Sequence, residues 1–198
     1  KGKPIETLYF GGGTPSQLDE KDFRKVFDTV RRIYVMENCH EITLEANPDD
    51  LCPEYLQMLS ELPFNRISMG IQTFDDTTLK LLKRRHNAAQ AIRAVELCRA
   101  HGFRNISIDL IYGLPGETTE RWEKDLQQAI ALDVEHISAY HLIYEEGTPI
   151  YKMLQKHQVE EVDEDSSVRF FTLLIDRLRE AGYEHYEISN FCKPGMYS

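Results

Sequence analysis

Apolar residues along this chain form two alternating patterns, which together predict strands followed by helices. Short and nearly continuous apolar runs predict buried strands at 8–10, 41–45, 66–72, 105–112 and 136–144. After each run, apolar residues recur at intervals of three or four, the spacing of one helix face. Five such strand–helix units in succession predict an α/β fold with a parallel sheet covered by helices.

Residues that favour helix ends set the predicted boundaries. The helices are expected to begin at or near Ser16, Pro53, Asp76, Thr118 or Thr119, and Asp163. The helix from Asp76 is expected to run without a break through Leu97 and to close at His101-Gly102. The last helix is expected to end at Gly182, and 183–188 alternates as a further strand.

The loop at 145–149 interrupts this strand–helix rhythm. We therefore interpret 1–148 as the core of one α/β domain, and 149–198 as an extension of that core with a helix and a strand.

Composition and charge restrict the function classes. A net charge of −10 argues against general nucleic-acid binding, which requires a basic surface. No apolar run approaches the length of a membrane span, and nothing at the N-terminus resembles a signal peptide. The cysteines lack the close spacing of a metal site, which favours free thiols in a reducing cytoplasm; they are Cys39, Cys52, Cys98 and Cys192.

The stretch Gly11-Gly12-Gly13-Thr14-Pro15 directly follows the first predicted strand. Three glycines allow unusual backbone conformations and leave the main chain bare toward a ligand. The spacing matches neither a phosphate-binding Walker loop nor the dinucleotide fingerprint. On its own, the stretch is equally consistent with a tight strand-to-helix turn.

Polar residues lie at or near the carboxyl ends of the later strands, where ligands of parallel α/β sheets bind. They include Glu45, Gln72 and Asp109, and Tyr140, His141 and Ile143 stand at the end of the fifth strand. Burying a carboxylate is costly unless it is paired, so the alternative for each is an internal salt bridge or hydrogen bond. Arg84 could meet a carboxylate at this edge, although Lys83-Arg84-Arg85 is also typical of a solvated surface.

Four motifs in order make the chain similar to a known family. Gly11–Pro15, Glu45-Ala46-Asn47-Pro48, Gly70-Ile71-Gln72 and the stretch 108–116 resemble the radical S-adenosylmethionine (SAM) enzymes, and more narrowly the oxygen-independent coproporphyrinogen III oxidases. The tail 160–194, above all 184–191, looks more like the HemW branch, whose members act in haem delivery. The resemblance implies a partial (β/α)6 radical SAM barrel that begins after the first strand and the cluster-binding loop.

The resemblance also implies the roles of the site residues in binding SAM. Gly12 and Gly13 would meet the methionine amino group, with Thr14 beside them; Glu45 would accept hydrogen bonds from SAM; Arg84 would face its carboxylate; Gln72 and Asp109 would bind the ribose or a neighbouring part; and Ile143 would pack near the adenine. These residue types suit a ligand that carries an ammonium, a carboxylate and a ribose diol.

The chain departs from the family pattern in one respect. The cluster-binding Cys-x3-Cys-x2-Cys motif of the family precedes the glycine turn, and none of the four cysteines can replace it. We therefore expect the ligands of the 4Fe–4S cluster to lie outside this chain, no metal ligand or catalytic residue within it, and no catalytic activity from the chain alone.

Two functions remain within this family. The favoured one is a HemW-like haem chaperone that holds SAM and a cluster, and whose partners are haem and a haem-accepting protein. The alternative is an oxidoreductase that decarboxylates two propionates of coproporphyrinogen III by radical hydrogen abstraction, giving protoporphyrinogen IX. A third possibility is an unrelated α/β barrel enzyme without affinity for SAM.

Overall fold

The computed structural model describes residues 2–198, which divide into two compact units. The first unit comprises the residues up to Gly70 together with Ala89–Ser107, and the second comprises Ile71–Ala88 and Ile108–Ser198. The strands within the described residues follow the hydrogen-bonding order β1-β2-β3-β4-β5-β7-β6. β3 (Arg66–Gln72) and β4 (Asn105–Tyr112) each begin in the first unit and end in the second.

The first unit is built on parallel strands with helices between them. Its elements include β1 (Thr7–Phe10), η1 (Pro15–Gln17), α1 (Glu20–Ile33), β2 (Glu41–Ala46), η2 (Pro48–Asp50), α2 (Pro53–Ser60) and α4 (Ala88–Ala100). β1 pairs with β2, with Phe10 opposite Leu44, and β2 pairs with β3, with Leu44 opposite Ile67. The parallel arrangement predicted from the continuous apolar runs is therefore confirmed for these strands.

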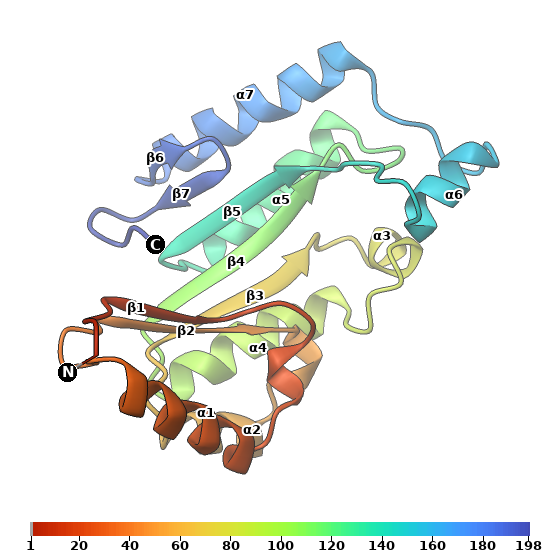
Figure 1. The fold of residues 1–198 in the computed structure, drawn as a ribbon. Helices are drawn as coiled ribbons and strands as arrows, with labels where there is room; N and C mark the ends of the chain where they lie inside the picture. The colour runs from red at the N-terminus through yellow and green to blue at the C-terminus, as the bar shows by residue number, and fades with distance from the viewer. Residues whose placement is uncertain (1) are drawn as a thin grey trace. The chain divides into compact units, whose positions relative to one another are not determined.

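Aromatic side chains join α1 to β1 in the core of this unit, where α1 runs along the sheet (Figure 1). Phe10 of β1 contacts Phe23 and Phe27 of α1, with ring centroids 5.7 and 5.2 Å apart. Phe64 packs edge-on against all three rings. Phe23 and Phe27 are almost fully buried, which fixes α1 against β1, the strand that leads to the glycine turn.

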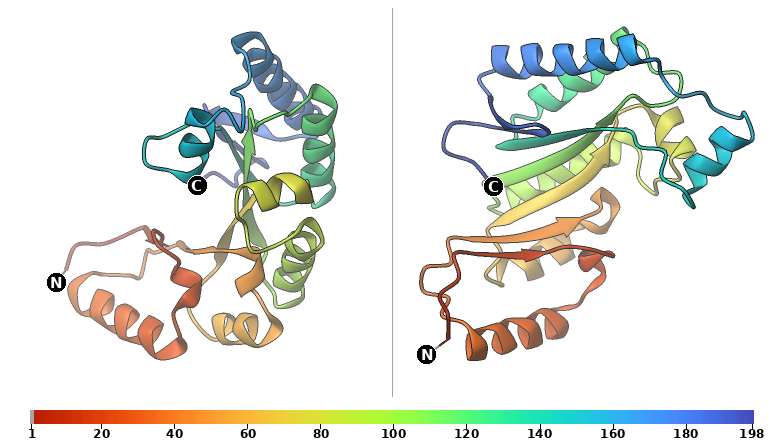
Figure 2. Two further views of the ribbon diagram at one scale, coloured as in Figure 1. Left: turned by 90° about the vertical axis from the view of Figure 1, so that its right-hand side faces the viewer. Right: turned by 45° about the horizontal axis from the view of Figure 1, so that its top comes forward.

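The second unit contains the ends of β3 and β4, together with α3 (Asp76–Leu81), α5 (Thr119–Ala131), β5 (His136–His141), α6 (Pro149–Gln155), α7 (Glu164–Glu180), β6 (Glu184–Glu187) and β7 (Asn190–Cys192). β7 is antiparallel to both β5 and β6, so the chain closes with a hairpin. α5 and α7 lie side by side in Figure 2. Between them, the buried Trp122 donates from Nε1 to Phe170 O at 3.0 Å.

The predicted helix from Asp76 through Leu97 is wrong, because the chain leaves the helix after α3 and starts α4 at Ala88. Lys83 takes a left-handed conformation with φ of 56°. Its N–H donates to Lys80 O, and the N–H of Arg84 donates to Leu79 O, which is the Schellman pattern of a helix end. Arg84 therefore lies in the connection between α3 and α4.

Other predicted boundaries were corrected by smaller amounts. Asp19, and not Ser16, caps α1, because the Asp19 carboxylate accepts from the N–H of Asp22 while the Ser16 hydroxyl donates to Asp50. The fifth strand ends at His141 rather than 144. α6 and β7 were not predicted at all.

The predicted division of the chain at residue 148 stays a prediction, and the two compact units divide elsewhere. Within residues 2–198, no helix is long and apolar enough to cross a membrane.

Candidate functional site

In the first unit, the glycine turn after β1 meets Glu45 of β2. Because Phe10 pairs with Leu44, Glu45 is level with the first residue after β1. The Tyr9 hydroxyl donates to Glu45 Oε1 at 2.8 Å, and the backbone N–H of Gly12 donates to Glu45 Oε2 at 3.0 Å. Both carboxylate oxygens are thus held in place, and each retains acceptor capacity for a ligand.

The glycines of the turn have different roles. A β-carbon at position 11 would lie 2.6 Å from Tyr9 Cε1 and 3.0 Å from the carboxyl carbon of Glu45, so a side chain there would displace that pair. Gly12 and Gly13 have positive φ angles of 77° and 59°, and no atom would lie within 4 Å of a β-carbon at either position. The main chain of Gly12 and Gly13 is therefore open to a ligand.

Hydrogen bonds also hold the short helix η1, which follows the glycine turn. The Ser16 hydroxyl and the Gln17 side-chain amide each donate to Asp50 at 2.6 Å, which joins η1 to η2. Thr14 is exposed, and its carbonyl oxygen accepts from the N–H of Gln17 at 3.0 Å. An open backbone beside a fixed carboxylate fits a ligand with an ammonium group, such as SAM.

In the second unit, Gln72 ends β3 in the left-handed region, with φ of 74°. Such a conformation costs about 1 kcal/mol or more for a residue with a β-carbon, so its surroundings must hold it. The next two residues both bind the buried Asp125 of α5. The Thr73 hydroxyl donates to Asp125 Oδ2 at 2.6 Å, and the N–H of Phe74 donates to Oδ1 at 2.9 Å.

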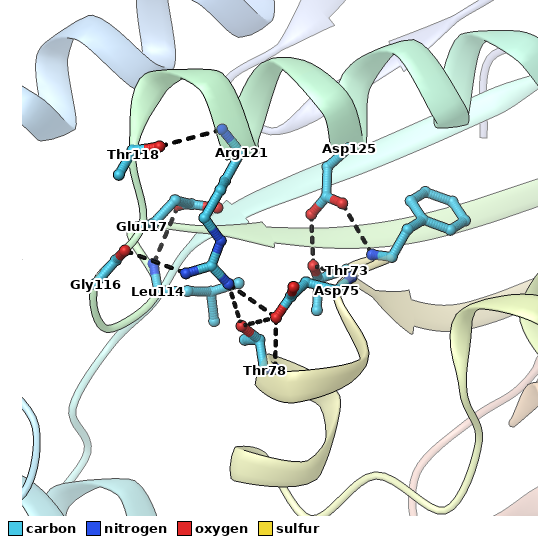
Figure 3. Close-up of polar contacts among 10 residues, drawn as sticks. Thr73, Asp75, Thr78, Leu114, Gly116, Glu117, Thr118, Arg121 and Asp125 are labelled. Carbon is cyan, nitrogen blue, oxygen red and sulfur yellow. Dashed lines mark hydrogen bonds and ion pairs between the residues drawn. The ribbon is translucent and has the colours of Figure 1, made fainter.

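Arg121, one turn earlier on α5, binds the same loop (Figure 3). Its Nη2 donates to Asp75 Oδ1 at 2.8 Å and to the Thr78 hydroxyl at 2.6 Å. Asp75 is the N-cap of α3, because its Oδ1 accepts from the N–H of Thr78 at 2.7 Å. Burial works against ionisation of Asp75, but the Thr78 and Arg121 contacts outweigh it and lower the pKa of this carboxyl.

Glu117, just before the cap of α5, holds the loop that follows β4. Its Oε2 accepts from the N–H of Gly113 at 2.6 Å and from the N–H of Leu114 at 3.2 Å. Burial raises the pKa of Glu117 to about 7, even though both backbone hydrogen bonds favour the charged form. Arg121 adds a bond from Nη1 to Gly116 O in the same loop.

The turn at Gly113 is fixed by His141 at the end of β5. A β-carbon on Gly113 would lie 2.5 Å from His141 Nε2, and φ of Gly113 is 73°. The His141 ring packs edge-on against Tyr112 and makes a 2.9 Å hydrogen bond between Nε2 and the Ser167 hydroxyl. Beyond β5, the side chain of Ile143 is 77% exposed and is free to contact a ligand.

The predicted site residues divide between the two units. The first unit holds Gly12, Gly13, Thr14 and Glu45, and it joins Gly12 directly to Glu45. The second unit holds Gln72, Arg84, Asp109 and Ile143. Asp109 is half-buried in β4, on the opposite face from the buried Ile108 and Leu110.

The sequence analysis missed the residues that hold the site residues in place. Tyr9 alternates with Leu8 and Phe10, but only the register of β1 with β2, which sets Tyr9 opposite Thr43, shows that it faces the same side as Glu45. Glu117, Arg121 and Asp125 recur at a spacing of four, and Arg121 and Asp125 lie on one face of α5 while Glu117 stands just before its cap. The distant partners of Arg121 and Asp125, which are Asp75 and Thr73, lie some fifty residues away and carry no local signal. Glu117, by contrast, binds the nearby N–H groups of Gly113 and Leu114.

No group of three His, Cys, Asp or Glu side chains within residues 2–198 could hold a metal ion. Cys98 and Cys192 are buried, Cys39 is half-buried and Cys52 is exposed. We therefore assign no cluster ligand to the described residues. The expectation that the cluster ligands lie outside this chain stays a prediction.

Comparison with known proteins gives consistent results. Residues 1–129 match the model of the radical SAM superfamily. The chain is 38% identical over 199 residues to the haem chaperone HemW of Bacillus subtilis, covering 100% of this chain and 52% of that protein. It is 34% identical to the mouse protein named radical S-adenosyl methionine domain-containing protein 1, mitochondrial, over 98% of this chain and 44% of that protein. The chain thus spans about half the length of the curated relatives it matches.

Among solved structures, the fold is similar to coproporphyrinogen III oxidase (HemN) from Escherichia coli. The TM-score is 0.83 at 25% sequence identity, and the match covers 96% of this chain and 44% of that chain. The archaeal Elp3 of Methanocaldococcus infernus matches at a TM-score of 0.72 and 20% identity, over 89% of this chain and 44% of that chain, which supports the fold alone.

Proposed function

This chain belongs to the radical SAM superfamily, and we propose that it forms part of a haem chaperone of the HemW kind. The observation that carries the proposal is 38% identity to a HemW protein along the entire chain, including the tail whose motif favoured this branch. The recognised family and the α/β radical SAM fold are confirmed. SAM and a 4Fe–4S cluster, the predicted cofactors, are those of the superfamily.

The proposed SAM contacts follow the chemistry of each predicted residue. The backbone carbonyls of Gly12 and Gly13 accept from the methionine ammonium, Thr14 lies beside it, and Glu45 accepts from an ammonium or hydroxyl group. In the second unit, Arg84 binds the SAM carboxylate, Gln72 and Asp109 bind the ribose or a neighbouring part, and Ile143 packs near the adenine. Support comes from the open backbone of the glycine turn, the fixed carboxylate of Glu45 and the exposed side chain of Ile143.

When bound, SAM and the cluster together supply radical chemistry, and the residues of this chain contribute binding and orientation. We propose no proton or electron transfer by any described residue. The proposed partners are haem and a haem-accepting protein, and the predicted cytoplasmic location stays a prediction.

A second candidate function is oxygen-independent coproporphyrinogen III oxidase. The observation that favours it is the similarity of fold to the Escherichia coli enzyme of that activity. Sequence identity to that enzyme is lower than to the HemW proteins, so the chaperone is the better supported of the two.

The test compares haem binding with substrate turnover in one sample. The full-length protein is reconstituted anaerobically with its cluster, supplied with SAM and reductant, and given either haem or coproporphyrinogen III. Haem binding without formation of protoporphyrinogen IX is the expected result. Turnover of coproporphyrinogen III with little haem binding would make the protein an oxidase and contradict the proposal.

A further inference from the structure

Residues that contact no proposed ligand hold Gln72 in its left-handed conformation. Gln72 has no glycine-like freedom, and its φ of 74° must be maintained by neighbouring contacts. Thr73 and Phe74, the two residues after it, are both fixed by one carboxylate, that of Asp125. We infer that Asp125 is a positioning residue that, through Thr73 and Phe74, presents Gln72 to SAM. This inference rests on the proposed role of Gln72 in SAM binding.

The geometry of Asp125 suits this role. Asp125 is only 6% exposed, so its two hydrogen bonds form away from competing water and are hard to replace. The bonds of 2.6 and 2.9 Å use both carboxylate oxygens, which fixes the orientation of the loop as well as its distance from α5. Thr73 is 1% exposed, so water cannot replace Asp125 as the partner of its hydroxyl.

Thr73 also links Asp125 to Asp75, the residue that caps α3. Its hydroxyl donates to Asp125 and accepts from the N–H of Asp75 at 3.1 Å. Asp75 in turn caps α3 and binds Arg121, one turn before Asp125 on α5 (Figure 3). The loop after Gln72 is therefore bonded to two residues of α5, Arg121 and Asp125. Asp125 is the one that binds the residues directly after Gln72.

The experiment measures SAM affinity and backbone protection in the full-length protein. Asp125→Asn keeps the size of the side chain but loses an acceptor, so we expect the SAM dissociation constant to rise on the order of tenfold. Thr73→Val removes the hydroxyl and should act in the same direction, whereas Thr73→Ser retains it and should bind SAM like the wild type. Glu120→Gln, which removes a charge from the exposed face of α5, is the matched control.

A double-mutant cycle separates positioning from general destabilisation. If Asp125 acts through Gln72, then Asp125→Asn should add little to the effect of Gln72→Ala on SAM affinity. Additive effects, or unchanged affinity in Asp125→Asn and Thr73→Val, would overturn the inference.

Hydrogen–deuterium exchange of 73–78 without SAM provides the independent readout. The N–H groups of Phe74 and Asp75 should exchange faster in Asp125→Asn and Thr73→Val than in the wild type and Thr73→Ser. Failure of the wild-type protein to bind SAM or haem would contradict the proposed function. In that case unchanged exchange in the variants overturns the positioning contact, and faster exchange supports it.

Discussion

At the scale of single residues, Glu117 has an unusual environment for a carboxyl group. It caps the N–H groups of Gly113 and Leu114, yet burial raises its pKa to about 7. Its ordinary value is 4.5, so the folded protein retains a proton that the unfolded chain releases. The contribution of Glu117 to stability therefore falls as pH rises from about 4.5 to about 7, and it is constant above that range.

This loss of stability with rising pH leads to a prediction for Glu117→Gln. The amide oxygen can still accept from the backbone, but the residue no longer loses a proton. The free energy of unfolding of the variant relative to the wild type should therefore be greater at pH 8 than at pH 5. The expected gain is ~1–3 kcal/mol in the free energy of unfolding, measured by urea denaturation at both pH values.

Glu120→Gln is the control for this titration. Glu120 is exposed, and hydrogen bonds to its own N–H and to Thr118 lower its pKa from the ordinary value of 4.5. The difference between this variant and the wild type should not change from pH 5 to pH 8. A pH-independent difference for Glu117→Gln as well would show that Glu117 does not titrate in this range.

At the scale of elements, the sequence analysis located the ends of those helices that stop at a glycine. α4 and α7 both end at a glycine with positive φ, Gly102 and Gly182, and both ends were predicted. Each glycine N–H bonds three residues back, and the next N–H bonds five residues back. α3 ends with the same pair of bonds, but Lys83 occupies the position that glycine usually fills. The sequence therefore carried no signal for this break.

The same geometry predicts the effect of Lys83→Gly. Lys83 is exposed and left-handed, so glycine should relieve backbone strain and raise the free energy of unfolding by up to ~1 kcal/mol. Lys80→Gly is the matched control, because Lys80 is also exposed but lies within α3, where glycine costs about 1 kcal/mol. Destabilisation of similar size in both variants would contradict this account.

Tertiary contacts account for β7, which remained unpredicted, whereas α6 begins at a local signal that was missed, the Thr148 cap followed by Pro149. β7 is three residues long, and pairing with β5 and β6 defines it rather than any apolar alternation of its own. The spacing of Glu117, Arg121 and Asp125 is visible in the sequence, but only the fold brings Arg121 to Asp75 and Asp125 to Thr73. Local patterns thus predicted most of the strands and helices, whereas the distant polar contacts that hold the loops required the structure.

At the scale of the whole molecule, the motifs at the strand ends carried more information than composition. The net charge of −10 only argued against nucleic acid, while the order of the four motifs gave the family that the comparisons confirm. Of the candidate site, the position of the glycine turn and of Glu45 at the same edge of the sheet followed from the strand order alone. The contribution of Tyr9 did not, because an aromatic residue in an apolar strand was interpreted as core.

The most direct test of the central claim is a calorimetric titration of SAM into the full-length protein and its Glu45→Gln variant. Loss of the charged acceptor should raise the SAM dissociation constant about tenfold or more, since hydrogen bonds to a charged group are the stronger kind. Tyr9→Phe, which only frees one carboxylate oxygen, should have a smaller effect, and Glu37→Gln at an exposed position should have none. Equal SAM affinity in Glu45→Gln and the wild type would contradict the assignment of the glycine turn and Glu45 as the SAM site.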